Sequence, residues 1–250
     1  MNATQGRLSG KRIAVLAADG FEYLELTGPR KALEAAGGQV DVVSLHPGRI
    51  RGMNLTQPTR TVRVDRELGQ ADADDYDALF VPGGFVGPDL LRQSRLARSF
   101  VRAFDIANKP IASLCHGPWL LVSAGLVEGR LVAAWPGIRD DVVHAGGIWR
   151  DEPVVRDRNW VTSRGPQDLH AFVPAMKELF AATAGSLALD HAAGNGNTHD
   201  DVASSPSRDE PPTLAVAGAR LLPGPTLRTL TFAAVGTALG AYAYRRAAAR

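Results

Sequence analysis

The chain has 250 residues, 45% of them hydrophobic, and contains one cysteine. This length and composition allow a substantial core in one large or two small domains, and one cysteine excludes an internal disulfide. The net charge is +2, and residues 213–250 hold five arginines and no acid, so the remainder carries −3. A mildly acidic body gives no reason to expect nucleic-acid binding by that body.

Short apolar runs alternate with helical patterns between a flexible N-terminus, residues 1–10, and residue 185. This alternation predicts an α/β domain over 11–185, with a mostly parallel sheet covered by helices on both faces. The predicted strands are 12–18, 40–45, 78–84, 111–115, 131–135 and 160–164, and the predicted helices are 29–36, 95–107, 118–124 and 168–182.

Three polar segments follow predicted strands, namely DGFEYLE, PGGFVGPD and CHGPW. Because the carboxyl ends of parallel strands meet at one edge of a sheet, these segments are the candidate site.

Cys115 lies where a strand ends and a helix begins, since Gly117 permits a sharp turn and Pro118 suits a first helical position. A helix N-terminus lowers the pKa of a thiol from about 8.5 toward 7 or below. The sequence therefore favours a nucleophile. The alternative is a buried cysteine that acts as a small hydrophobe.

Five motifs, in order ADGFEYLEL, FVPGGFVGPDLLR, SLCHGPWLLVSAGLVEGR, AAWPGIRDDVVHAGGIWRDEPVV and NWVTSRGPQDLHAF, closely resemble the ThiJ/PfpI family. The resemblance covers about residues 10–183 and is to the branch of PfpI-like proteases, general stress proteins and glutathione-independent glyoxalases. It implies a flavodoxin-like, doubly wound fold related to class I glutamine amidotransferase domains, with a nucleophile elbow at Cys115.

The resemblance also implies roles for three side chains. Cys115 matches the family nucleophile, His116 its histidine partner, and Glu25 the acid that approaches the thiol. A carboxyl beside a thiolate is expected to keep its proton. The alternative for Glu25 is a capping acid in the first turn of a helix, and Glu22 is expected to be a solvated or structural charge.

In PfpI-type proteases an acid from a neighbouring subunit orients the histidine, and Asp89 is the nearest match here. This implies a homo-oligomer whose site lies near a subunit interface. The alternative for Asp89 is an acid at a helix N-terminus, and its short side chain puts its reach in doubt.

The resemblance further suggests that the backbone of Gly83 and Gly84 forms an oxyanion hole with the N–H of His116. Trp119 is expected to form a pocket wall or to lie in the core. His46, His144 and His170 have no partners at metal-ligand spacing, so we expect neither a metal nor an external cofactor.

Three functions follow from the resemblance. The first is a cysteine-dependent glyoxalase or deglycase that acts on reactive carbonyls such as methylglyoxal or glycated adducts. The second is an intracellular cysteine peptidase, and the third is a non-enzymatic redox-sensing or chaperone-like stress protein.

The family does not explain the C-terminal part of the chain. Residues 186–212 are rich in Gly, Asn, Ser, Asp and Pro, which predicts a disordered linker. Residues 213–250 form a basic apolar tail, in which 229–244 carry no charge between flanking arginines. Three alternatives are open for this run: a membrane-associated helix, a helix docked on the body or a partner, or disorder. The N-terminal stretch MNATQGRLSGKR has no signal-peptide core, so we expect a cytoplasmic location.

Overall fold

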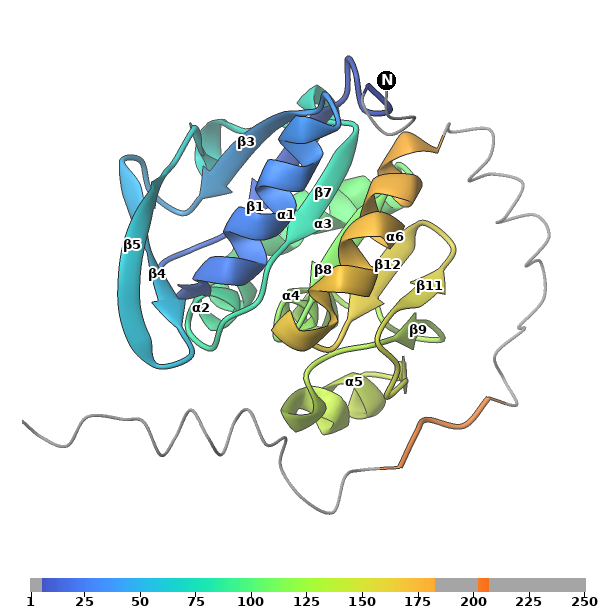
Figure 1. Cartoon of the computed structure of the whole chain (residues 1–250). Helices are drawn as coiled ribbons and strands as arrows, with labels where there is room; N and C mark the ends of the chain where they lie inside the picture. Colours follow the sequence, from blue (N-terminus) through green and yellow to red (C-terminus); the bar gives the residue numbers. More distant parts are fainter. Residues whose placement is uncertain (1–5, 183–201, 207–250) are drawn as a thin grey trace, which may run out of the picture. The chain divides into compact units, whose positions relative to one another are not determined.

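A seven-stranded sheet forms the centre of the computed structural model, which describes residues 6–182 and 202–206 (Figure 1). The strand order is β11-β12-β8-β7-β1-β3-β6, and all neighbours are parallel except β11 and β12. The predicted α/β fold with a mostly parallel sheet is therefore confirmed. The strands are β1 (Arg12–Leu16), β3 (Gln39–Ser44), β6 (Arg66–Glu67), β7 (Ala78–Val81), β8 (Ile111–Leu114), β11 (Val155–Asp157) and β12 (Trp160–Ser163).

The inner strands are apolar because both of their faces are covered. Every residue of β7, β8 and β12 is buried, as expected for the middle of a parallel sheet. On one face lie α1 (Tyr23–Ala35) and α6 (Leu169–Ala181); on the other lie α2 (Gly87–Gln93), α3 (Arg95–Ile106) and α4 (Pro118–Ser123) (Figure 1).

The helices bury apolar residues at helical spacing. In α3 the buried positions are Ala97, Phe100, Val101 and Phe104, and the Ser94 side chain caps the first turn by accepting from the Ala97 N–H. The carboxyl ends of β1, β7 and β8 thereby meet at one edge, between the two helical layers.

The first helix begins earlier than its sequence predicts. Pro29 suggests a helix start, but it lies inside α1, which starts at Tyr23. The buried positions Glu25, Leu26, Pro29 and Leu33 share one face, so packing on the sheet outweighs the backbone bond that a proline removes. This shift places Glu25 in the first turn of α1.

The predicted strand 131–135 is also only partly correct. Only β9 (Leu131–Val132) is extended, and it pairs with β10 (Ile148–Trp149) outside the central sheet. Helix α5 (Arg139–His144) packs against β10. This small subdomain borders the edge where the site lies.

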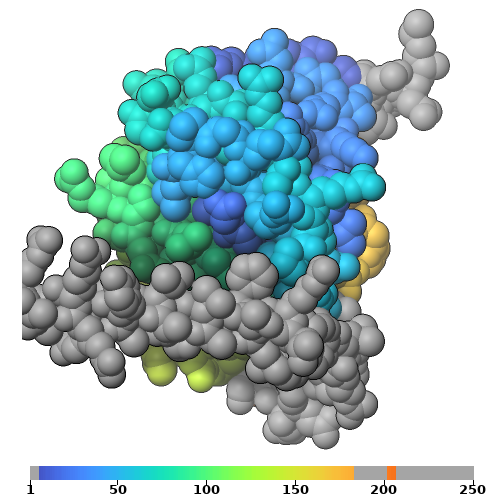
Figure 2. Space-filling model, turned by 90° about the vertical axis from the view of Figure 1, so that its left-hand side faces the viewer, coloured from blue at the N-terminus to red at the C-terminus, as the bar shows by residue number. Residues whose placement is uncertain are grey.

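A three-stranded sheet of β2 (Phe21–Glu22), β4 (Arg49–Asn54) and β5 (Gln57–Arg63) is absent from the sequence-based prediction. Its hairpin has few apolar residues, and only Ile50 and Gly52 are buried in β4. The hairpin faces the viewer in Figure 2. Because β2 leads directly into α1, the hairpin borders the same site edge.

The tail, including 229–244, and most of the predicted linker lie outside the described residues. Within the range predicted as a linker, residues 202–206 are placed and bond to the domain. In the described part of the chain, no helix is long and apolar enough to cross a membrane.

Candidate active site

Cys115 occupies a strained elbow between β8 and α4. Its φ of +59° lies in the left-handed region, which non-glycine residues adopt at a cost. Its N–H donates to the Ser163 carbonyl at 3.0 Å, and its carbonyl accepts from the Trp135 N–H at 2.9 Å. A Cβ on Gly117 would lie 2.6 Å from the Val81 carbonyl oxygen, so only glycine fits there. The turn therefore holds the thiol in one place.

Glu25 points from the first turn of α1 toward this thiol and is fully buried. Its Oε2 accepts from the Gly83 N–H at 2.9 Å, whereas its Oε1 is buried and has no hydrogen-bond partner among the described residues. A Cβ on Gly83 would overlap both Glu25 and the Cys115 Cβ. Close approach of three chain segments thus brings carboxyl and thiol together.

The carboxyl and the thiol are coupled. Burial, and secondarily the charge of Glu22, raises the pKa of Glu25 to about 8, so Glu25 keeps its proton at neutral pH. Burial and the neighbouring Glu25 raise the pKa of the Cys115 thiol, against the lowering by the Gly84 and His116 N–H groups. Burial therefore acts against the lowered thiol pKa expected from the helix N-terminus, and α4 offers only a short helix of six residues.

His116 lies beside the thiol under aromatic rings. Its Nδ1 is 3.3 Å from the Cys115 Sγ, and its ring is 4.6 Å from Phe85, 5.0 Å from Trp119 and 5.8 Å from Trp135 between centroids. Burial lowers the pKa of His116 to about 4, and the charge of Asp141 acts in the opposite direction. The imidazole is therefore neutral at pH 7 and can accept a proton.

The three main-chain N–H groups predicted to bind an oxyanion are not all free to do so. The Gly83 N–H is bound to Glu25, so it is not left for an oxyanion, which corrects the prediction for this residue. The N–H groups of Gly84 and His116 instead face the sulfur. These two donors can stabilise negative charge next to Cys115.

Asp89 lies in the first turn of α2, where its Oδ2 accepts from Gln93 at 2.8 Å. Among the described residues, no hydrogen bond or ion pair joins Asp89 to His116. Within one chain, Asp89 therefore matches the helix-acid alternative, and action across a subunit boundary stays a prediction.

Glu22 lines the site and matches the structural alternative of its expected role rather than the solvated one. It is 5% exposed and its Oε2 accepts from the Leu55 N–H at 2.8 Å, at the turn of the β4–β5 hairpin. Burial raises the pKa of Glu22. No sequence signal identifies this contact, because the hairpin itself is missed.

A cavity of about 20 Å³ adjoins the thiol, which is room for roughly one water molecule. Trp119, predicted as a pocket wall, is not among its lining residues and instead contacts His116. Trp135 is the aromatic wall that the sequence analysis missed. The cavity is lined by Glu22, Glu25, Leu55, Gly84, Phe85, Cys115, His116, Trp135 and Pro166. In the described part of the chain, no cluster of three or more His, Cys, Asp or Glu residues is placed to hold a metal.

Cys115 lies on a strand-to-helix elbow of a doubly wound sheet, next to a carboxyl and an imidazole. This arrangement places the chain in the class of α/β proteins with a cysteine at the centre of the site. The sequence model of the DJ-1/PfpI family matches residues 11–179. The chain belongs to the DJ-1/PfpI family.

Relatives and a solved structure resemble the same region. The chain is 41% identical over 163 residues to "Putative cysteine protease YraA" of Bacillus subtilis, which covers 65% of this chain and 94% of the relative. It is also 41% identical over 162 residues to "Deglycase TK1284" of Thermococcus kodakarensis, covering 65% and 95%. DJ-1beta of Drosophila melanogaster has a similar structure, with a TM-score of 0.63, 25% identity, and coverage of 74% of this chain and 97% of that one.

The buried carboxyl should make stability depend on pH. A folded pKa near 8 against an ordinary 4.5 means that Glu25 binds a proton more tightly in the folded state, so its stabilisation is lost as pH rises toward 8. His116 contributes the opposite slope, but only below its ordinary value of 6.5. Between pH 6.5 and 8, we expect the unfolding free energy of the wild type to fall by up to about 1.4 kcal/mol per pH unit because of Glu25. Glu25→Gln should not show this fall.

Denaturant unfolding at several pH values measures this slope. Glu34→Gln on the exposed face of α1 is the control, because Glu34 pairs with Arg30 at the surface. Equal slopes in wild type and Glu25→Gln would show that the carboxyl is ionised in the folded state.

Proposed function

We propose that this chain is a cofactor-independent cysteine enzyme that converts small reactive carbonyl compounds, as a glyoxalase or deglycase. The observation that carries the proposal is the contact of one buried thiol with a protonated carboxyl and a neutral imidazole beside a small cavity. Such a site holds both a proton donor and a proton acceptor at pH 7.

For a 2-oxoaldehyde, the first step is addition. The Cys115 sulfur bonds to the aldehyde carbon as the thiol proton passes to His116, and Glu25 protonates the carbonyl oxygen to give a hemithioacetal. Proton loss accompanies the attack because the low pKa of His116 does not hold the proton beforehand. The Gly84 and His116 N–H groups stabilise the oxygen as charge develops.

Proton transfer and hydrolysis complete the reaction. The Glu25 carboxylate removes the hydrogen from the former aldehyde carbon and a proton is returned to the adjacent carbon, so the hemithioacetal becomes a thioester. Water cleaves the thioester, which gives a 2-hydroxy acid and regenerates the thiol. In total, one 2-oxoaldehyde and one water molecule are converted to one 2-hydroxy acid.

Cavity size limits what the site can bind. A volume of about 20 Å³, with the half-exposed Phe85 packed against His116, admits even a 2-oxoaldehyde only with movement of the wall, and a peptide backbone would need a larger movement. The relative named a putative cysteine protease supports peptide hydrolysis as the second candidate, through an acyl-enzyme on the same thiol.

Substrate assays separate these candidates. We expect purified protein to consume methylglyoxal or to release the free amino acid from a glycated one, Cys115→Ser to be inactive, and Glu25→Gln to lose about 10² to 10⁴ in rate. Glu34→Gln should retain full activity. Cleavage of a fluorogenic peptide with no turnover of either carbonyl substrate would favour the peptidase, and a folded Glu25→Gln with unchanged rate would exclude proton transfer by Glu25.

We infer that Asp141 is a positioning residue for His116. Its charge favours the imidazolium, and its Oδ1 lies 3.9 Å from the Arg92 Nη1, while Arg92 stacks over Trp119 at 5.0 Å. Trp119 in turn contacts the His116 ring. Asp141 thus acts on His116 through its charge and through the Arg92–Trp119 contacts rather than by a direct hydrogen bond.

We expect Asp141→Asn to lower the His116 pKa further and to reduce kcat/KM roughly threefold to tenfold, since a half-exposed, paired charge contributes about 1 kcal/mol. NMR titration of the His116 ring reports the pKa. Asp140→Asn is the matched control, because Asp140 is 70% exposed and pairs with Arg139. Equal titration curves in both variants would show that Asp141 does not act on His116.

We also propose that the chain forms a homo-oligomer beside this site. Phe85, Val86 and Leu90 are 43%, 49% and 37% exposed around Asp89, so apolar side chains gather where a second subunit could bring its acid. This arrangement supports the role in trans suggested for Asp89.

Light scattering tests the interface. Leu90→Glu should dissociate the oligomer and lower activity, because a charge would be buried in an apolar contact. Ile106→Glu is the control: Ile106 is 84% exposed and ends α3 far from the carboxyl ends of the strands. A wild-type protein that is monomeric and fully active would refute the proposal.

A further inference from the structure

Residues 202–206 bind to the small β9–β10 sheet although they lie beyond the family domain. The family match ends at residue 179, and the segment is separated from α6 by residues outside the described ranges. Strand β10 pairs with β9 on one side. Its other side presents main-chain groups of Trp149, which an extended segment can bind.

Four hydrogen bonds join the segment to this edge. The Ser205 N–H donates to the Trp149 carbonyl at 2.8 Å, and the Trp149 N–H donates to the Ser204 Oγ at 3.1 Å. The Asp151 N–H donates to the Ser205 Oγ at 3.2 Å, and the Arg139 Nε donates to the Ser205 carbonyl at 2.9 Å. Both serines are half-buried, whereas the preceding Ala203 is exposed.

The hydrogen bonds show which kind of peptide fits this edge. The hydroxyl groups of Ser204 and Ser205 accept from the two N–H groups that face outward from this edge, those of Trp149 and Asp151. The Arg139 guanidinium donates to the main-chain carbonyl of Ser205. Alanine at either serine position would leave one N–H unsatisfied, which costs about 1–3 kcal/mol when the group is buried. The edge therefore fits an extended Ser-Ser segment.

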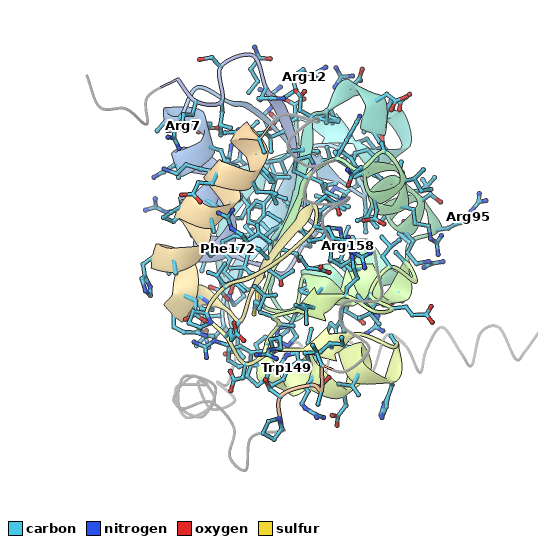
Figure 3. The ribbon with its side chains drawn as sticks, turned by 90° about the vertical axis from the view of Figure 1, so that its right-hand side faces the viewer. Arg7, Arg12, Arg95, Trp149, Arg158 and Phe172 are labelled. Atoms are coloured by element: carbon cyan, nitrogen blue, oxygen red, sulfur yellow. The ribbon has the colours of Figure 1, made fainter. Side chains whose placement is uncertain are left out.

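We propose that the outer edge of β10, together with Arg139, is a docking site for an extended Ser-Ser peptide, and that the chain's own residues 202–206 occupy it. The site thereby fixes residues 202–206 on the domain. Figure 3 shows Trp149 at the end of the domain where this segment runs.

This docking site connects to the wall of the active site. The Trp149 indole N–H donates to the Ala134 carbonyl at 3.3 Å, and the next residue, Trp135, lines the cavity. Arg139 begins α5, which also carries Asp141. Residues 202–206 are thus attached to β10, which bonds to the residue before Trp135, and to α5, which carries Asp141, whatever reaction the site performs.

Hydrogen exchange of the full chain tests the docking through two separate amides. Ser204→Ala should speed exchange of the Trp149 N–H at least tenfold with little change at Asp151, and Ser205→Ala should do the reverse. Ala203→Ser is the control and should change neither, because that side chain is exposed. Fast exchange of both amides in the wild type, or an absence of this crossed pattern, would overturn the docking.

A second measurement tests whether the edge accepts a separate peptide. Ser205→Pro in the full chain removes the N–H that binds Trp149 and should release the segment. A synthetic peptide of sequence DVASSPS should then restore slow exchange at Trp149 and Asp151, while DVAAAPS should not. Failure of the first peptide to protect either amide would overturn a docking site for separate peptides and leave only a contact within the chain.

Discussion

The site depends on keeping a carboxyl and a thiol together out of water. Each group, if ionised, raises the pKa of the other, and burial penalises both anions. The least costly arrangement at neutral pH leaves Glu25 protonated, and a protonated carboxyl is both a hydrogen-bond donor and a stored proton. The chemistry proposed for the site follows from this one constraint.

The surrounding backbone is shaped to satisfy the constraint. Gly83 has no side chain because Glu25 and Cys115 fill the space that a Cβ would need. The positive φ of Cys115 aims its side chain at the strand ends, and hydrogen bonds to Ser163 and Trp135 hold that strained conformation. Aromatic rings around His116 exclude water, which keeps the imidazole neutral and able to accept the proton that the thiol gives up.

Local sequence patterns account for the fold and for part of the site. The buried strands and the elbow at Cys115 could be predicted because apolar runs, Gly117 and Pro118 act over a few residues. Glu25 was identified only through resemblance to a family. The sequence indicates Glu22 only as a charge and gives no sign of Trp135 or Asp141, because their positions depend on the β4–β5 hairpin, the β9–β10 sheet and α5, which pack from distant parts of the chain. The start of α1 was placed wrongly because packing of its buried face outweighed the local signal of Pro29.

The β4–β5 hairpin has a consequence for colloidal behaviour. Strand β5 pairs only with β4 in the described part of the chain, so one row of its main-chain groups is open to another strand. Pro58 lacks an N–H, and the exposed Arg60 and Arg63 place positive charges along the strand, which discourages edge-to-edge pairing between molecules. Natural sequences with uncharged residues at these positions would lose that electrostatic protection, and their aggregation would become sensitive to concentration and salt before their folding was affected.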